Sequence, residues 1–394
     1  MSIWPRLELG EVVEINPRQP KGIPEAQAVS FVPMAAVNEA QGKIVDRQVR
    51  EFATVSKGFT TFADGDVLFA KITPCMENGK AAIARDLVNG IGAGSTEFYV
   101  LRPGQRILPE FLFHFVRRQS FREACKSHFA GSGGQQRVPR PYLQKVALPV
   151  PPLEEQRRIV SVLNRADEIK RRADAARTKA RAINSALFLD LFGDPGTNPK
   201  GWQPVRLQEV IDRIVGGKNV EAGNGSSPYR ILKVSAVTSG QFQPRESKPA
   251  PDGYQPPPEH YVRKGDFLFS RANTSALVGA VALVEDDPVG LLLPDKIWRI
   301  KWRRTVVEPR FAYSLLRSSA IRRTFSKIAS GTSDSMKNIS QAKLIRIEVP
   351  MPPLSLQTAF AEQIGHVESV ASRLDAAAVK AKAMAAAMSA EVFG

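Results

Sequence analysis

Few residues of this chain have the types and spacing that catalysis at a metal ion or a phosphate requires. The four histidines lack ligand spacing, and the two cysteines, Cys75 and Cys125, cannot complete a zinc site. The histidines are His114, His128, His260 and His366. The chain has no Gly-x-x-x-x-Gly-Lys-Ser/Thr loop for nucleotide hydrolysis and no Asn/Asp-Pro-Pro-Tyr/Phe segment for methyl transfer to a flipped base. We therefore expect no catalytic residue, no metal site and no cofactor in this chain.

Positive charge is the second chemical feature. Lys and Arg number 55 against 39 Asp and Glu, which gives a net charge of +16, and the pI is near 10.0. Residues 1–193 and residues 194–394 each carry a surplus of eight positive charges. Two equally basic halves are typical of a protein that meets DNA or RNA twice, because each contacting surface needs cations for the phosphates. The alternative from charge alone is a soluble protein that is merely basic.

The two halves are copies of one module. Residues 148–153 (LPVPPL) recur as residues 349–354 (VPMPPL), and the Phe-Gly pair at 192–193 recurs at 393–394. The offset is 201 positions here and drifts slightly in the earlier matches, as insertions in loops would cause. A period near 200 residues is too long for a solenoid. The chain is therefore expected to hold two globular parts, each followed by a helix.

Sequence signals for cell compartment are few. No apolar stretch approaches the roughly 20 residues that span a bilayer, and the first residues lack the pattern of a secretory signal. Both cysteines lie in the first half, so they form no repeated disulfide framework. We expect a cytoplasmic protein without a membrane partner.

Each copy shows the same order of elements. Short β-rich runs (residues 66–70, 80–84 and 97–101 in the first copy) predict a mixed sheet. Pro109 and Pro309 then open helical patterns that extend to Cys125 and Ile328. Polar Gly/Ser loops follow at residues 131–137 and 331–338, and each leads to a short strand and a proline hinge.

Beyond the hinges, apolar residues at alternating three- and four-residue steps predict two long helices. The first stripe is Ile159, Leu163, Ala166, Ile169, Ala173, Ala176, Ala180, Ile183, Leu187 and Leu191, and the second is Phe360, Ile364, Val367, Val370, Leu374, Ala377, Ala381, Met384, Met388 and Val392. Such a seam needs a partner helix, and the nearest partner is the other copy. A buried helical hairpin in one core is the alternative, but the first helix is too rich in Arg and Lys for that. Residues 193–201, between the first helix and Trp202, are expected to form a hinge.

Several short motifs resemble the specificity subunits of Type I restriction-modification systems. They are residues 148–156 (LPVPPLEEQ) before a charged helix, residues 191–195 (LFGDP) and 198–202 (NPKGW), and residues 337–340 (KNIS) before the second hinge. Their order and spacing span the whole chain. The two copies depart from each other in places, because residues 136–139 read QRVP where the second copy has KNIS.

The resemblance implies a fold and a set of partners. Each globular part would be a target recognition domain that reads one half of a split, asymmetric site in double-stranded DNA. The helices would pair as an antiparallel coiled coil that sets the gap between the half-sites. Methyltransferase subunits and restriction (translocase) subunits would dock on this chain and would bring S-adenosylmethionine, ATP and Mg. This chain itself would not be an enzyme.

Base reading needs side-chain donors and acceptors at base edges, with Lys and Arg on phosphates to fix the register. The loops that differ between the copies offer such groups. The candidate DNA-binding residues are Lys71, Thr73, Asn78, Gln135, Gln136, Arg137 and Arg140 in the first copy, and Arg271, Asn273, Thr274, Lys337 and Asn338 in the second. Each of these Arg and Lys residues is equally well explained as a solvated surface charge.

We therefore predict an α+β fold of two recognition domains and two helices forming an antiparallel coiled coil. The predicted boundaries are 1–150 for the first recognition domain, 151–193 for its helix, 194–351 for the second recognition domain and 352–394 for its helix. Alternative functions are the specificity subunit of another restriction-modification system with a split site, a self-sufficient enzyme acting on nucleic acid, and a helical scaffold without a nucleic-acid role.

Overall fold

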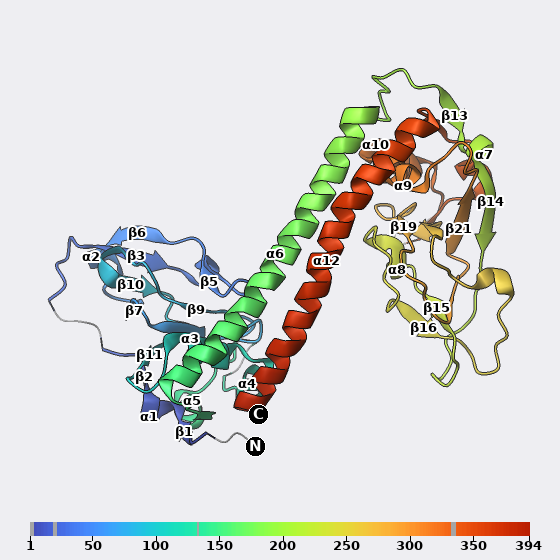
Figure 1. Cartoon of the computed structure of the whole chain (residues 1–394). Helices are drawn as coiled ribbons and strands as arrows, with labels where there is room; N and C mark the ends of the chain where they lie inside the picture. The colour runs from blue at the N-terminus through green and yellow to red at the C-terminus, as the bar shows by residue number, and fades with distance from the viewer. Residues whose placement is uncertain (1–3, 19–21, 132–133, 332–335) are drawn as a thin grey trace. The chain divides into compact units, whose positions relative to one another are not determined.

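The chain folds into two compact units that each contain a globular part. A computed structural model describes residues 4–18, 22–131, 134–331 and 336–394 (Figure 1). Unit 1 comprises Met1–Asp174 with Leu374–Gly394, and unit 2 comprises Ala175–Arg373. Two 40-residue helices, α6 (Leu153–Phe192) and α12 (Leu354–Phe393), each contribute to both units. The predicted α+β class, with two repeated globular parts and two long helices, is confirmed.

Two four-stranded sheets form the globular part of unit 1. One has the order β2-β11-β8-β9 with antiparallel neighbours, and the other has the order β6-β3-β10-β7 with a parallel β3–β10 pair. The strands are β1 (Arg6–Glu8), β2 (Val13–Ile15), β3 (Ala28–Val32), β4 (Val37–Asn38), β5 (Lys43–Ile44), β6 (Gln48–Glu51), β7 (Thr60–Ala63), β8 (Val67–Ala70), β9 (Ala81–Ile83), β10 (Ile91–Gly94), β11 (Phe98–Pro103) and β12 (Ala147–Pro149). The three β-rich runs predicted from the sequence are thus strands β8, β9 and β11.

Unit 2 repeats the first sheet closely and the second in reduced form. Its sheets have the orders β14-β21-β17-β19 and β16-β15-β20, and the β15–β20 pair is again parallel. The strands are β13 (Pro204–Arg206), β14 (Ile211–Gly216), β15 (Arg230–Leu232), β16 (Ser247–Pro249), β17 (Phe267–Ser270), β18 (Ala272–Asn273), β19 (Val281–Leu283), β20 (Leu291–Leu292), β21 (Ile297–Trp302), β22 (Lys337–Asn338) and β23 (Glu348–Pro350). In each unit the first strand pairs with the last, β1 with β12 and β13 with β23.

Short helices pack on the sheets of each unit. Unit 1 has α1 (Leu9–Val12), α2 (Phe52–Val55), α3 (Pro109–Arg117), α4 (Gln119–Lys126) and α5 (Arg140–Lys145), with 3-10 turns η1 (Met34–Ala36) and η2 (Val88–Gly90). Helix α2 packs on β3 and β6 of the second sheet of unit 1. Unit 2 has α7 (Leu207–Val210), α8 (Ser235–Thr238), α9 (Pro309–Arg317), α10 (Ser319–Ile328) and α11 (Gln341–Leu344), with η3 (Pro258–His260).

The helical patterns that open at Pro109 and Pro309 are each broken into two helices. The backbone is extended at Arg118 (φ −58°, ψ 141°) and at Ser318 (φ −57°, ψ 147°). Ser318 caps α10 by accepting a hydrogen bond from the Ile321 amide. The break turns α4 back so that Phe121 packs against Phe115, with ring centroids 5.0 Å apart. Apolar spacing alone did not reveal the break, because both helices face one core.

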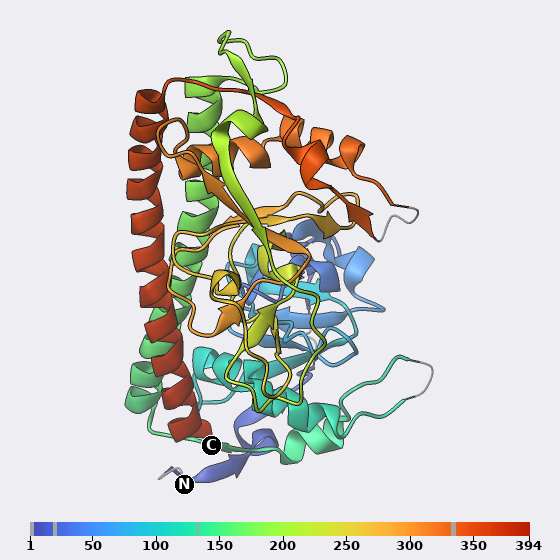
Figure 2. The same cartoon turned by 90° about the vertical axis from the view of Figure 1, so that its right-hand side faces the viewer.

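The long helices are antiparallel neighbours in both units. In unit 1 the start of α6 shares a core with the end of α12, through Ile159, Leu163 and Phe393. In unit 2 the end of α6 meets the start of α12, where the rings of Phe192 and Phe360 lie 5.4 Å apart. Figures 1 and 2 show the two helices side by side from two directions. The predicted antiparallel pairing is confirmed.

The predicted apolar stripes are correct at most positions, including late ones such as Ala180, Ala381 and Val392, and wrong at a few. Ile183 is 48% exposed, and Val370 and Met384 are 59% and 54% exposed, whereas Phe188 is buried. Ala377 is exposed as well. Steps that alternate between three and four residues have a period of 3.5, whereas a straight α-helix turns every 3.6 residues. A displacement by one position therefore places Val370 outside while its neighbour Ala371 is buried, and the stripe is buried again at Val392.

Residues 193–201 form a closed turn. The Asn198 side chain donates to the Trp202 carbonyl at 2.7 Å and accepts from the Trp202 amide at 3.0 Å. The Trp202 indole donates to the Phe192 carbonyl at 3.0 Å. Gly193 has a φ of +76°, which suits glycine. Hydrogen bonds therefore fix both ends of the predicted hinge.

A polar contact interrupts the apolar seam of unit 2. The Asn184 side-chain amide donates to Glu368 at 3.2 Å, and Arg310 forms an ion pair with Glu368 at 3.0 Å. Burial nevertheless raises the pKa of Glu368 above its ordinary value. Desolvation of this carboxylate therefore outweighs its favourable partners.

Glu368→Gln is expected to stabilise the chain at pH 7. A carboxyl whose folded pKa lies above its unfolded pKa adds stability below the unfolded value, near 4.5, and loses it as the pH rises through the folded pKa. Glutamine removes the charge and keeps the hydrogen-bonding groups. We expect a gain of up to about 1 kcal/mol at pH 7 that shrinks toward pH 4. Denaturant unfolding at the two pH values measures this, and a loss of stability at pH 7 would show that the Arg310 ion pair dominates.

Among the described residues, no helix is both long and apolar enough to cross a membrane.

Candidate nucleic-acid interface

In unit 1, two loops distant in sequence lie side by side beyond strand β8. Ile72 and Arg137 form an antiparallel bridge, the Thr73 amide donates to the Gln136 carbonyl at 3.0 Å, and the Gln136 amide donates to the Thr73 hydroxyl at 3.1 Å. We call residues 71–73 and 134–138 the first loop pair. It brings together five of the predicted residues: Lys71, Thr73, Gln135, Gln136 and Arg137. Gln135 and Gln136 are exposed.

Both cations of the first loop pair contact residues at the start of strand β11. Arg137 forms an ion pair with Glu97 at 2.8 Å, and its hydrogen bonds hold the pKa of Glu97 below the ordinary value. The Lys71 ammonium lies 5.4 Å from the centre of the Tyr99 ring. A paired guanidinium is held in one orientation and keeps further N–H groups for a ligand. The first loop pair therefore presents fixed positive charge beside two exposed glutamine amides.

Unit 2 builds the same feature from different residues. Strand β18 pairs with β22, so that Ala272 faces Asn338 and Asn273 faces Lys337. The Ile339 amide donates to the Arg271 carbonyl at 2.8 Å. We call residues 271–274 and 336–339 the second loop pair. It brings together the predicted residues Arg271, Asn273, Thr274, Lys337 and Asn338.

Arg271 of the second loop pair likewise contacts residues near the start of strand β21. Arg271 donates to the Asp295 carbonyl at 2.7 Å, lies 3.6 Å from the Asp295 carboxylate, and lies 5.8 Å from the centre of the Trp298 ring. The Asn273 side-chain oxygen accepts from the Thr274 amide at 2.9 Å, while its amide nitrogen is buried without a hydrogen-bond partner. An unpaired buried donor costs free energy. Such donors are common at sites that a ligand completes.

Two predicted residues lie outside the loop pairs. The Arg140 guanidinium donates to the Ile15 carbonyl at 2.9 Å, so it ties α5 to β2. Asn78 is exposed in the turn after Thr73, where its backbone amide donates to the Pro74 carbonyl at 3.0 Å. The centres of the predicted Gly/Ser loops, residues 132–133 and 332–335, lie outside the described residues.

Sequence reasoning missed the groups beneath the loop pairs. Tyr99 and Trp298 occupy the same place in β11 and β21, and each lies under the cation at the start of its loop pair. Glu97 and Asp295 supply the carboxylates. An aromatic residue near the start of each strand was visible as a repeat, but nothing local tied it to Lys71 or Arg271. The sequence therefore gave no signal for these contacts.

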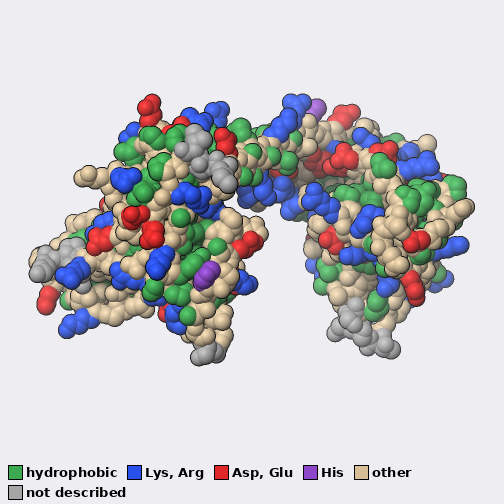
Figure 3. Space-filling model, turned by 90° about the horizontal axis from the view of Figure 1, so that it is seen from below, with side chains coloured by type: hydrophobic (Ala, Val, Ile, Leu, Met, Phe, Trp, Pro, Cys, Tyr) green, Lys and Arg blue, Asp and Glu red, His purple; other side chains and the backbone are tan. Residues whose placement is uncertain are grey.

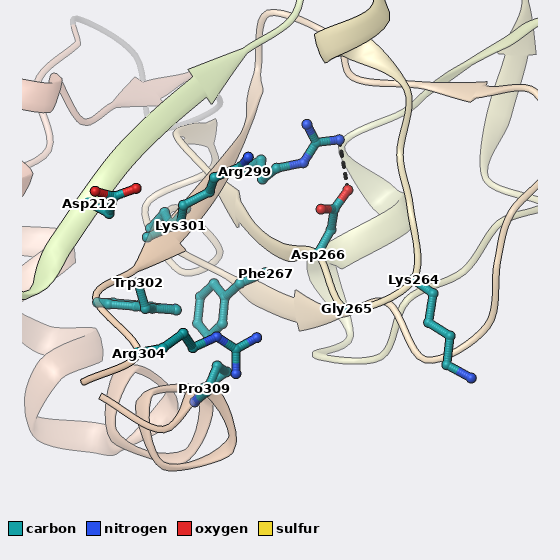
Figure 4. Close-up of a pocket in the computed structure, with 11 residues that line it drawn as sticks. Asp212, Lys264, Gly265, Asp266, Phe267, Arg299, Lys301, Trp302, Arg304 and Pro309 are labelled. Carbon is teal, nitrogen blue, oxygen red and sulfur yellow. Dashed lines mark ion pairs between the residues drawn. The ribbon is translucent and has the colours of Figure 1, made fainter. Parts of the chain in front are cut away.

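A separate cavity in unit 2 lies at the opposite end of β17 from the second loop pair. It has a volume of about 350 Å³ and is lined by Lys264, Asp266, Arg299, Lys301 and Arg304, among others (Figure 4). Arg299 pairs with Asp266 at 2.7 Å. Since the loop pair follows β17 and Asp266 precedes it, the cavity is not part of the candidate interface.

Positive charge extends beyond the loop pairs. Figure 3 shows Lys and Arg side chains spread over the visible faces of both globular parts. Within the described ranges, no group of three or more His, Cys, Asp or Glu side chains is placed to hold a metal ion.

The architecture is an α+β unit that occurs twice, each time followed by a long helix, and the two helices are antiparallel within each unit. Residues 1–176 match the family model of the Type I restriction modification DNA specificity domain. The chain is 25% identical over 450 residues to the EcoEI specificity subunit of Escherichia coli, an alignment that covers 90% of this chain and 76% of the relative. It is 37% identical over 253 residues to the EcoAI specificity subunit of Escherichia coli, covering 63% of this chain and 42% of that relative.

Solved structures show the same fold. The S subunit of a Type I restriction-modification system from M. genitalium has a TM-score of 0.62 at 12% identity, covering 99% of this chain and 96% of that one. A chain from a study of complex assembly and conformational transition of the type I R-M system has a TM-score of 0.52 at 22% identity, covering 99% and 97%. Residues 1–176 thus match the DNA specificity domain of this family, and the chain as a whole is similar to Type I restriction-modification specificity subunits.

Proposed function

We propose that this chain reads a split, asymmetric site in double-stranded DNA, with one half-site for each unit. The observation that carries the proposal is the loop pair, which is built twice in the same place from different side chains. The first presents Lys71, Thr73, Gln135, Gln136 and Arg137, and the second presents Arg271, Asn273, Thr274, Lys337 and Asn338. Arginine suits the acceptors of guanine, and Asn or Gln suits adenine. Both loop pairs offer these groups but in a different order along the chain, so we expect them to read different base sequences, called words below.

The chemistry of restriction and modification belongs to partner chains in this proposal. Methyltransferase subunits, with S-adenosylmethionine, and restriction subunits, with ATP and Mg, act on the DNA that this chain selects in the cytoplasm. The recognition domains are residues 1–150 and 194–351, and residues 151–193 and 352–394 form the helices that set the gap between half-sites. The relatives are named specificity subunits, which supports a non-catalytic role.

Binding to duplex DNA is expected to weaken steeply as salt rises. Each neutralised phosphate contributes a slope of roughly 0.9 to the fall of log affinity against log salt. Two basic units predict contacts to several phosphates, and hence a loss of about a thousandfold between 50 and 200 mM salt for six or more contacts. Fluorescence anisotropy of the chain with its methyltransferase partner measures the slope. A flat response would favour the scaffold function that does not involve nucleic acid.

A further inference from the structure

The turn that follows each candidate reading segment is clamped by the same two positions of a helix. In unit 1 the Arg122 guanidinium, on α4, donates to the Glu77 carbonyl, and Lys126, one helical turn later, pairs with the Glu77 carboxylate at 2.9 Å. Buried Gly79 closes this turn, and an added Cβ there would lie 3.3 Å from the guanidinium carbon of Arg122. The turn therefore rests directly on the arginine.

Unit 2 repeats the clamp on a turn of different sequence. The Arg322 guanidinium, on α10, donates to the Ala276 carbonyl at 2.8 Å, and Ser326, one helical turn later, donates to the Ser275 carbonyl at 2.9 Å. Gly279 closes the turn with a φ of +78°, and an added Cβ would lie 2.4 Å from the Phe325 ring. The arginine thus contacts main chain in both units.

The clamped turns are continuous with the loop pairs. In unit 1 the Met76 amide donates to the Ile72 carbonyl at 2.9 Å, inside the first loop pair. In unit 2 the amides of Leu277 and Val278 donate to the Thr274 carbonyl at 3.0 and 2.9 Å, at the end of the second loop pair. A shift of either turn therefore moves the residues that precede it.

In unit 2 the clamp has a cost for the fold. Burial lowers the pKa of Arg322, and one of its terminal nitrogens is buried without a hydrogen-bond partner. A half-buried cation with an unpaired donor commonly stabilises a fold less than an apolar side chain of the same size does. An arginine nevertheless holds the turn at the same place in both units, which points to a role other than stability.

We propose that Arg122 and Arg322 are positioning residues, each of which holds one loop pair in the geometry that discriminates between bases. The inference rests on the proposed function. Neither guanidinium needs to touch DNA, because it acts through the turn. Groups that read bases must be held within fractions of an ångström, and residues behind them supply that rigidity.

The test is base discrimination by the full complex with its methyltransferase. It is measured on a library of duplexes that each carry one base-pair substitution in either half-site. Arg322→Met keeps the length of the side chain and removes its donors. We expect the preference for the correct base to fall roughly tenfold in the half-site read by unit 2, and to stay unchanged in the other. Arg122→Met should lower the preference in the half-site read by unit 1 and leave the half-site read by unit 2 unchanged. The slope of affinity against salt should stay unchanged in both variants.

Two further variants serve as controls, one for charge and one for folding. Arg323→Met removes an equal charge from an exposed position of α10 and should leave discrimination intact in both half-sites. Arg322→Lys keeps a donor and should give an intermediate loss, which covers the case that Arg322→Met does not fold. An equal loss of base discrimination in both half-sites, or no loss in either, would contradict this inference and leave the proposed function standing. A wild-type complex that methylates no split site would remove the proposed function and this inference together.

Discussion

A chain cut after Gly193 is expected to form a two-fold dimer. In the full chain the end of α12 fills the core of unit 1, where the Phe393 ring lies 5.0 Å from Phe111 and 5.7 Å from Phe115. Removal of α12 leaves this core open. The repeat places Leu191 and Phe192 at the positions of Val392 and Phe393, so a second copy offers the same residues on an antiparallel helix.

The truncated dimer should read an inverted repeat of the first half-site. Sedimentation should give a dimer, and methylation with the partner subunit should move to a palindromic version of one word. Phe192→Asp in the truncated chain is the matched control, because a carboxylate cannot fill the open core and should prevent pairing. A folded monomer of residues 1–193 would contradict pairing between the copies.

Longer helices are expected to widen the gap between the half-sites. The turn at residues 193–201 is held closed by Asn198 and Trp202, so extra residues there would loop out. The sharper change is to insert whole heptads into both helices, after Asp174 in α6 and after Asp375 in α12, which keeps the seam close to register. Each heptad lengthens a helix by roughly 10 Å, or about three base-pair steps of 3.4 Å.

The number of heptads provides a test of geometry. Three base pairs also turn the DNA grooves by roughly 100°, whereas three heptads, about 31 Å, match nearly one full turn of 10–10.5 base pairs. One added heptad should therefore weaken methylation, and three should restore it at a gap about nine base pairs longer, with both words unchanged. The same insertion in α6 alone misaligns the seam and serves as the control. An unchanged gap after three heptads would contradict the spacer role.

Local patterns in the sequence predicted the elements well. The proline hinges before α6 and α12, the apolar steps around Ile159 and Phe360, and the strand patterns near Asp66 and Glu97 depend on periodicities of one element, and the structure confirms them. The pattern was wrong at single positions such as Ile183, which is exposed although Ala180 before it is buried, because the helical period is not an exact alternation of three and four.

Side-chain contacts between distant segments within the globular parts could not be predicted. Arg137 was a candidate for its charge, but its pairing with Glu97 depends on how β11 passes beneath the loop. Arg140 was a candidate for the same reason, and its guanidinium instead binds the Ile15 carbonyl. The clamps made by Arg122 and Arg322 depend on the breaks at Arg118 and Ser318, which apolar spacing did not show. Such contacts follow from the folded chain and not from neighbours in sequence.

The central claim is that one chain reads two different words at a fixed separation. The most direct test is single-molecule sequencing of methylated bases in cells that carry the complete system, with and without this chain. We expect two unlike words separated by one constant gap, and we expect this methylation to disappear when this chain alone is deleted. Methylation that persists without the chain, or that marks one continuous word, would contradict the account.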